Sequence, residues 1–263
     1  MVNSSLRGAA KDLARRVVPH SLRPQLRLWH NRLTWPLYLG ANVACNCCDG
    51  RFRRFRSWSD EHGGLWPMCP RCGSLGRQRV DWLFLSTRTD LHAGPKRLLH
   101  VAPEVCFADS LQQQPNIDYL SADYDSALAM ERMDITNIDY PDDSFDVVLC
   151  NHVLVYVEDD MRAMREIFRV LRSGGWALLQ VPIDVDRERT FEDASVTDSR
   201  ERHRVFGQYD HVRVYGRDYV PRLEQAGFDV SVDDFVTTLP ASTIARNGLD
   251  TSEIVYLARK PML

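Results

Sequence analysis

Four of the seven cysteines in this 263-residue sequence form two C-x-x-C pairs, a pattern that could hold a metal ion. The ligands would be Cys45, Cys48, Cys69 and Cys72, with the 20 residues from Asp49 to Met68 between the pairs. Glycines after each pair let the chain fold back, so that backbone amides can point at the sulfurs. Two such knuckles predict a closed, tetrahedral site for structural zinc. The alternatives are ligation through Cys47, in a C-x-C arrangement, and four thiols without metal.

A second set of polar residues stands where apolar, strand-like runs end. Asp123 follows the loop after the first run by about 20 residues, the spacing at which an acid meets ribose hydroxyls in nucleotide-binding folds. Asp134 is a further acid, ahead of the third run, and Cys150-Asn151-His152 lies at the tip of that run. Parallel sheets bind ligands at the carboxyl ends of their strands. A nucleotide-type site is therefore predicted, although each acid alone could equally be a loop or cap residue.

Three histidines, His152, His203 and His211, are candidates for a general base, because histidine titrates near neutral pH. His203 lies in the charged run RERHR and is expected to be solvated, which leaves His152 and His211. His152 directly follows the third apolar run, and His211 follows the polar segment from Asp184 to Arg204. That segment is too long for a simple connection, so we expect a lid or acceptor-binding insertion. His152 could instead only pack beneath a ligand, and His211 could be a hydrogen-bonding lid residue.

The elements that must position these residues alternate between strand and helix. The expected strands are Arg97–Ala102, Ile117–Ala122, Phe145–Cys150, Trp176–Val181 and Ile254–Ala258. The expected helices are Val105–Gln113, Asp218–Gln225, and one that starts after Asp159-Asp160, has Arg172 in its last turn and ends at Gly174-Gly175. The alternation predicts an α/β, Rossmann-like, doubly wound and mostly parallel sheet, behind an N-terminal zinc-ribbon-like segment.

Composition divides the chain into three parts. Residues 1–43 form a basic, partly helical arm, 44–80 a zinc-binding segment with four cysteine ligands, and 81–263 the alternating domain, with an insertion at about 184–215. Within the first 40 residues, Asp12 is the single acid, against the positive residues Arg7, Lys11, Arg15, Arg16, Arg23, Arg27 and Arg32. The arm could dock on the rest of the protein or, as a less favoured alternative, make weak contact with anionic lipid headgroups.

Bulk properties exclude several classes of protein. The net charge is only −3, so the chain does not bind polyanions through overall charge. No apolar run approaches the roughly 20 residues that a membrane helix needs, and the N-terminus lacks the apolar core of a secretory signal. These features predict a cytoplasmic protein, and nothing in the sequence indicates its oligomeric state.

The segment from Ser144 to Pro182, SFDVVLCNHVLVYVEDDMRAMREIFRVLRSGGWALLQVP, resembles the class I S-adenosylmethionine-dependent methyltransferases of type 11. The resemblance extends from Pro95 to Lys260 and implies an S-adenosylmethionine cofactor. It implies that Asp123 holds the ribose beside Tyr124, that Asp134 contacts the adenine amine with Ile135 beside the ring, and that Asn151 and His152 lie beneath the methyl donor.

The first loop departs from the Gly-rich pattern of that family. It is Ala102-Pro103-Glu104 preceded by His100, and it resembles the LHxAPE variant of a subset with a zinc segment in front. That subset also carries a FGQ.DHVR.YG stretch behind, and FGQYDHVRVYG spans Phe206 to Gly216 here. The resemblance therefore implies that His100, Ala102, Pro103 and Glu104 contact the cofactor.

The predicted function is O-methylation of a hydroxyl on a small molecule or glycan. A neutral alcohol is a poor nucleophile, so a histidine base, His152 or His211, would remove its proton. One alternative is a zinc-containing RNA methyltransferase, in which Arg51, Arg53, Arg54 and Arg56 interleave with Phe52 and Phe55. Against this alternative, the third strand does not end in the Asn/Asp-Pro-Pro-aromatic motif that serves methylation of exocyclic amines on bases. Nucleic acid is therefore a disfavoured partner. A second alternative is a binding protein without turnover.

Overall fold

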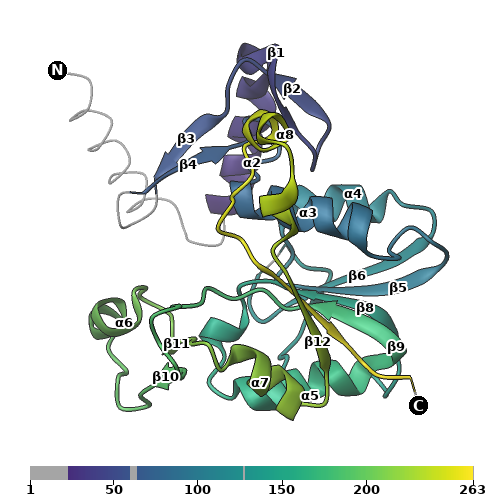
Figure 1. Cartoon of the computed structure of the whole chain (residues 1–263), viewed down its shortest axis with the longest axis vertical. Helices are drawn as coiled ribbons and strands as arrows, with labels where there is room; N and C mark the ends of the chain where they lie inside the picture. The colour runs from purple at the N-terminus through teal and green to yellow at the C-terminus, as the bar shows by residue number, and fades with distance from the viewer. Residues whose placement is uncertain (1–22, 60–63, 127, 263) are drawn as a thin grey trace.

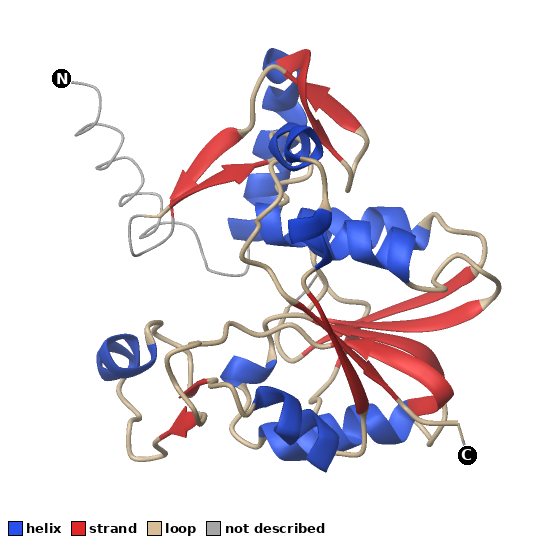
Figure 2. Ribbon diagram, in the orientation of Figure 1, coloured by secondary structure: helices blue, strands red, loops and turns tan. Residues whose placement is uncertain are grey.

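A seven-stranded sheet forms the centre of the protein (Figures 1 and 2). The structure is a computed structural model that describes residues 23–59, 64–126 and 128–262. In spatial order the strands are β12 (Asp229–Asp233), β13 (Val255–Arg259), β9 (Leu171–Leu178), β8 (Phe145–Cys150), β5 (Lys96–Val101), β6 (Ile117–Asp123) and β7 (Glu131–Arg132). Strand β13 pairs antiparallel with β12 and with β9, and all the other strand pairs are parallel. The predicted Rossmann-like, mostly parallel sheet is confirmed.

Helices cover both faces of this sheet, which explains why its strands are apolar on both sides. On one face lie α3 (Gly76–Arg88) and α4 (Val105–Gln112), and on the other α5 (Asp160–Val170) and α7 (Tyr219–Gln225) (Figure 2). Alternate strand residues serve the two faces, so Leu98 packs with α3 and α4 and Leu99 packs with α5.

The N-terminal elements form a separate layer above α3 and α4 (Figure 1). They are α2 (Arg23–Thr34), the 3-10 turn η2 (Trp35–Tyr38), the hairpin β1 (Leu39–Cys45) with β2 (Gly50–Phe52), and the hairpin β3 (Arg56–Ser59) with β4 (Leu65–Met68). Helix α8 (Ala241–Asn247), from the C-terminal part of the chain, lies over β1. This layer shares one apolar core with α3 and α4.

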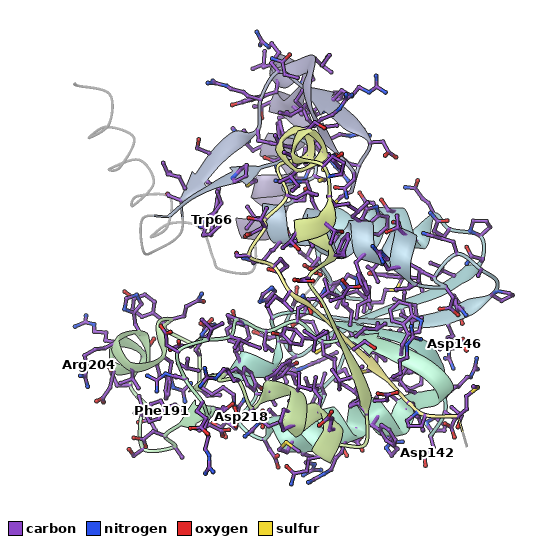
Figure 3. The ribbon with its side chains drawn as sticks, viewed as in Figure 1. Trp66, Asp142, Asp146, Phe191, Arg204 and Asp218 are labelled. Carbon is purple, nitrogen blue, oxygen red and sulfur yellow. The ribbon has the colours of Figure 1, made fainter. Side chains whose placement is uncertain are left out.

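The segment between β9 and α7 projects from the sheet and contains the residues predicted to form an insertion (Figure 1). It contains β10 (Phe191–Glu192), α6 (Ser199–Phe206) and β11 (Arg213–Val214), and Phe191 and Arg204 mark its outer edge (Figure 3). It packs on the 3-10 turn η3 (Leu154–Tyr156), where the buried Arg213 donates to the Leu154 carbonyl oxygen. A further 3-10 turn, η4 (Phe235–Thr238), follows β12. None of the helices in the described ranges is long and apolar enough to cross a membrane.

The helix after Asp159 starts as predicted but ends earlier. The Asp159 side chain accepts a hydrogen bond from the Arg162 amide at 2.9 Å, so it caps the helix. The predicted end at Gly174-Gly175 is wrong, because Leu171 is already extended and pairs with Phe145 in the sheet. Gly174 adopts φ +79 inside β9, where the strand register shifts. The sheet pairing therefore competes successfully with the last helical turn.

Candidate cofactor and metal sites

The four predicted metal ligands meet in one cluster. The sulfurs of Cys45, Cys48, Cys69 and Cys72 all lie within 4.8 Å of one another. Sγ of Cys45 is 3.6 Å from that of Cys72, and Sγ of Cys48 is 3.7 Å from that of Cys69. Zinc–sulfur bonds of about 2.3 Å in a tetrahedron would separate the sulfurs by about 3.8 Å, so the residues fit zinc. Cys47 points elsewhere, toward the Gln78 carbonyl oxygen at 3.7 Å.

Each knuckle closes through a residue in the left-handed region. Gly73, with φ +78, donates its amide to the Cys69 carbonyl oxygen at 3.1 Å. In the other knuckle the positive φ, +54, falls on Asp49 rather than on the following glycine. Cys106 and Cys150 are buried in the apolar cores on the two faces of the sheet, as small apolar residues would be.

Helix α3 connects the cysteine cluster with the loop after β5. Asn46, inside the first knuckle, donates to the Arg79 carbonyl oxygen at 2.7 Å. The preceding residue of the helix, Gln78, makes two contacts. Its carbonyl oxygen accepts from the Cys47 thiol, and its side-chain amide donates to the Glu104 carboxylate at 3.0 Å. The first turn of α3 is thus held on one side by the first cysteine knuckle, and on the other side it reaches the predicted cofactor loop.

The loop after β5 takes a backbone conformation that is usual for glycine, although the loop contains no glycine. Ala102 has a φ of +47, which lies in the left-handed region that residues other than glycine rarely occupy. Its amide donates to the Ala122 carbonyl oxygen at 2.8 Å, which holds the loop against the end of β6. The chain therefore makes the tight turn of a Gly-rich loop with a methyl group in place of hydrogen.

Glu104 lies at the centre of a polar cradle under this loop. Its carboxylate accepts from Gln78 at 3.0 Å and from Asn151 at 2.9 Å, and its amide donates to His100 Nε2 at 3.2 Å. Burial alone would raise the pKa of Glu104, but the neighbouring His100 and the bonds from Asn151 and Gln78 hold it below its ordinary value. The side chain is therefore a buried, ionised acceptor that could receive a cationic group.

Four buried polar atoms beside this cradle have no hydrogen-bond partner. They are Oδ1 of Asn151, Nε2 of His152, Oδ2 of Asp81 and Nε of Arg77, from a total of seven such atoms within the described ranges. An unpaired buried polar group costs about 1–3 kcal/mol, so native proteins seldom leave several together. Asn151 and His152 follow β8 directly, and Arg77 and Asp81 lie on the facing start of α3, so the four atoms point to a polar ligand at this edge of the sheet.

Asp123 and Asp134 end up near the strand ends, each holding its own loop. Oδ1 of Asp123 accepts from the amides of Asp125 and Ser126, at 2.8 and 2.7 Å. Oδ1 of Asp134 accepts from the amide and hydroxyl of Thr136, both at 2.8 Å. Ile135 is buried and Tyr124 is exposed. These bonds fit the cap alternative, and the adenosine contacts implied for the four residues stay predictions.

The two candidate bases differ in position. His152 adopts φ +55 and donates its amide to the Gln180 carbonyl oxygen; burial and the nearby Arg77 lower the pKa of its imidazole to about 4. His211 stacks edge-on with Tyr156 and lines a hollow of about 290 Å³ with Pro182, Phe206 and others from the insertion. Burial lowers the pKa of His211, so both rings are neutral at pH 7.

Three polar residues that the sequence did not single out complete this edge. The side-chain amide of Gln180, two residues after the end of β9, donates to Glu253 at 3.0 Å and to Asp81 at 3.3 Å. Burial raises the pKa of Glu253 to about 7, and burial next to Glu253 raises the pKa of Asp81. The one sequence signal for Asp81 was an acid between Val80 and Trp82 in an otherwise apolar run.

Comparison with known proteins adds independent support. A family model described as "Methyltransferase domain" matches residues 103–179, which include Glu104, Asp123, Asp134 and Asn151. No curated protein matches the sequence. Among solved structures, the chain is similar to an S-adenosylmethionine-dependent methyltransferase from Mesorhizobium loti, with 20% identity, a TM-score of 0.47, and coverage of 68% of this chain and 97% of that chain. It is also similar to the cyclase SpnF, with 14% identity, a TM-score of 0.48, and coverage of 94% and 98%. The family match covers the part of the Rossmann-like sheet that carries these residues, and the proposed methyltransferase activity rests on it.

Proposed function

We propose that the protein transfers the methyl group of S-adenosylmethionine to a hydroxyl of a small molecule or glycan. The observation that carries the proposal is the set of four unpartnered buried polar atoms beside the Glu104 cradle. The cofactor supplies a methyl group activated by its sulfonium. Donors and acceptors that are already fixed and desolvated can orient such a ligand without reorganising when it binds.

The residues present fit this cofactor. Glu104 offers a buried carboxylate for the methionyl ammonium, and Oδ1 of Asn151 offers a second acceptor next to it. Asp123, at the end of β6, is the proposed ribose ligand. These assignments rest on the position of each group at the carboxyl edge of the sheet.

His211 is the better placed of the two candidate bases. It lines the hollow under the insertion, and an acceptor held there would meet its imidazole from the side of the insertion. A lowered pKa keeps the ring neutral and able to take the hydroxyl proton at pH 7. His152 lies deeper, and its much lower pKa makes it a weaker base that we assign to holding the ligand.

The function is tested by transfer of a labelled methyl group into fractionated cell extract. We expect label in the glycan or small-molecule fraction. Label confined to RNA would overturn the proposed acceptor, and binding of S-adenosylmethionine without any transfer would show a binding protein instead.

The base is tested with His211→Ala. Loss of a general base lowers turnover by about 100-fold or more, with cofactor affinity in calorimetry unchanged. His203→Ala is the matched control, because His203 stacks on Tyr209 in the same insertion but does not line the hollow. Unchanged turnover in His211→Ala would contradict the assignment and move the role to His152.

A further inference from the structure

The N-terminal layer exposes a concentration of large apolar side chains. Of 14 exposed large hydrophobic residues in the described ranges, six fall within residues 29–66: Trp29, Leu33, Leu37, Leu39, Leu65 and Trp66. Trp29, Leu33 and Leu37 are 63%, 73% and 69% exposed, so none of them is covered by another described part of the chain. Apolar side chains gathered on one surface, unlike scattered ones, mark a site of interaction.

Three of these residues form a line along one side of α2 and η2, which we call the α2 stripe. Trp29, Leu33 and Leu37 are spaced four residues apart, so they follow one another on successive turns. The other side of α2 is docked on the protein. There Asn31 is buried and accepts from Arg56 at 2.8 Å, and Trp35 packs against the core of the cysteine segment. The apolar side is thus turned outward while a polar residue is buried.

Arginines border the α2 stripe. Arg32 is exposed between Trp29 and Leu33, and the Arg53 guanidinium donates to the Leu37 carbonyl oxygen. Arg51 and Arg54 are exposed on the same hairpin segment. The sequence adds to this charge, because the first 40 residues carry seven positive side chains and one acid. An apolar stripe with an interfacial tryptophan and flanking arginines is the composition of segments that lie on anionic lipid.

We propose that the α2 stripe and its flanking arginines dock the protein on an anionic lipid surface. Trp29, Leu33 and Leu37 enter the headgroup region, while the arginines contact lipid phosphates. A single-stranded nucleic acid would use aromatic rings between the arginines, whereas two of the three stripe residues are aliphatic. A second copy of the chain would bring two basic arms together, which like-charge repulsion disfavours. The stripe lies in the layer farthest from α5 and α7, so docking leaves those helices uncovered (Figure 1).

The full chain is tested by flotation with phosphatidylcholine vesicles, with and without phosphatidylglycerol. We expect binding only to the anionic vesicles, and release by high salt. Replacing Trp29, Leu33 and Leu37 together by Ser lowers vesicle affinity by about tenfold or more. The matched control is Val232→Ser with Met262→Ser, because these apolar residues are also exposed, at 53% and 86%, and lie outside this layer. Deleting residues 1–22 then separates the contribution of the first half of the basic arm from that of the α2 stripe.

Three outcomes would overturn the proposal. Equal vesicle binding by the triple variant and its control would exclude the α2 stripe. Binding of RNA in a filter assay, with no vesicle binding, would assign the surface to nucleic acid. A change from dimer to monomer in the triple variant, seen by sedimentation without vesicle binding, would make the surface a contact between copies. The methyl-transfer assay is independent of all three.

Discussion

At the scale of single residues, Glu253 is expected to make the free energy of unfolding depend on pH. Burial raises the pKa of this carboxyl from about 4.5 to about 7. The folded protein therefore holds the proton more tightly than the unfolded chain does. The resulting stability is fully present below about pH 4.5 and is lost as the pH rises through about 7. We expect Glu253→Gln, which stays uncharged and still accepts from Gln180, to exceed the native protein at pH 8 by about 1–3 kcal/mol in free energy of unfolding.

Urea unfolding at a series of pH values measures this difference. The difference should disappear well below pH 4.5, where the carboxyl of the native protein is protonated in both the folded and the unfolded state. Glu224→Gln, an exposed acid on α7, is the control and should leave the pH profile unaltered. Parallel profiles for Glu253→Gln and the native protein would show that the carboxyl is not desolvated.

Ala102 shows what residue types alone can and cannot predict. The absence of glycine from the first loop gave no indication of its shape, because φ is a property of the backbone rather than of the residue type. The loop nevertheless takes φ +47 at Ala102, since the pairing of β5 with β6 and the bonds of Glu104 determine its course. His152, with φ +55, follows the same principle at the end of β8. Both left-handed residues border the proposed ligand site.

At the scale of elements, α3 depends on one buried arginine. The Arg79 guanidinium donates to backbone carbonyls of four residues outside the helix, namely Ser74, Pro67, Asn247 and Gly248. It also stacks on Phe55, with its carbon 4.3 Å from the ring centroid. A lysine ammonium has three donors and no planar fork, so it cannot serve all these acceptors. Arg79→Lys should lower the free energy of unfolding by about 3 kcal/mol or more.

Chemical denaturation against Arg165→Lys, an exposed arginine on α5, isolates this effect. The control should change stability by less than about 0.5 kcal/mol. A loss of the same small size in Arg79→Lys would mean that the carbonyls are satisfied without the guanidinium.

The contrast between α5 and α3 explains how far elements could be predicted. In α5 the apolar residues keep a helical period and Asp159 caps the start, so the helix was predicted with an error only at its end. In α3 the polar residues Gln78, Arg79 and Asp81 interrupt the apolar pattern. These side chains face the cysteine segment and the cofactor loop, where buried polar partners replace apolar contacts. The helix was therefore not predicted, because the residues that serve the site interrupt its periodicity.

At the scale of the whole molecule, the four-cysteine cluster and the proposed ligand site are joined through short contacts. Cys47 lies between two of the predicted metal ligands. Its thiol donates to the Gln78 carbonyl oxygen, and its own carbonyl oxygen accepts from the Ser110 hydroxyl of α4 at 3.1 Å. Gln78 in turn donates to Glu104, the proposed ligand of the methionyl ammonium. A closed site with four cysteine ligands has no position for a substrate, so its effect on the reaction must pass through this connection.

Removal of the predicted zinc should therefore weaken binding of S-adenosylmethionine, although it changes none of the proposed cofactor ligands. Without zinc, the four thiolates, whose sulfurs lie within 4.8 Å of one another, repel one another or take up protons. The knuckle that contacts Gln78 then becomes less ordered. We expect a chelator to raise the dissociation constant for S-adenosylmethionine by about tenfold or more, and amides of α3 and of the loop at Ala102 to exchange hydrogen faster. Cys72→Ser should reproduce both effects, whereas Cys106→Ser, which removes a buried thiol outside the cluster, should keep the metal. The opposite outcome is loss of the metal with no change in cofactor affinity or in hydrogen exchange of the α3 amides. The two sites would then be energetically independent, and the contact through Gln78 would serve only to pack the two layers together.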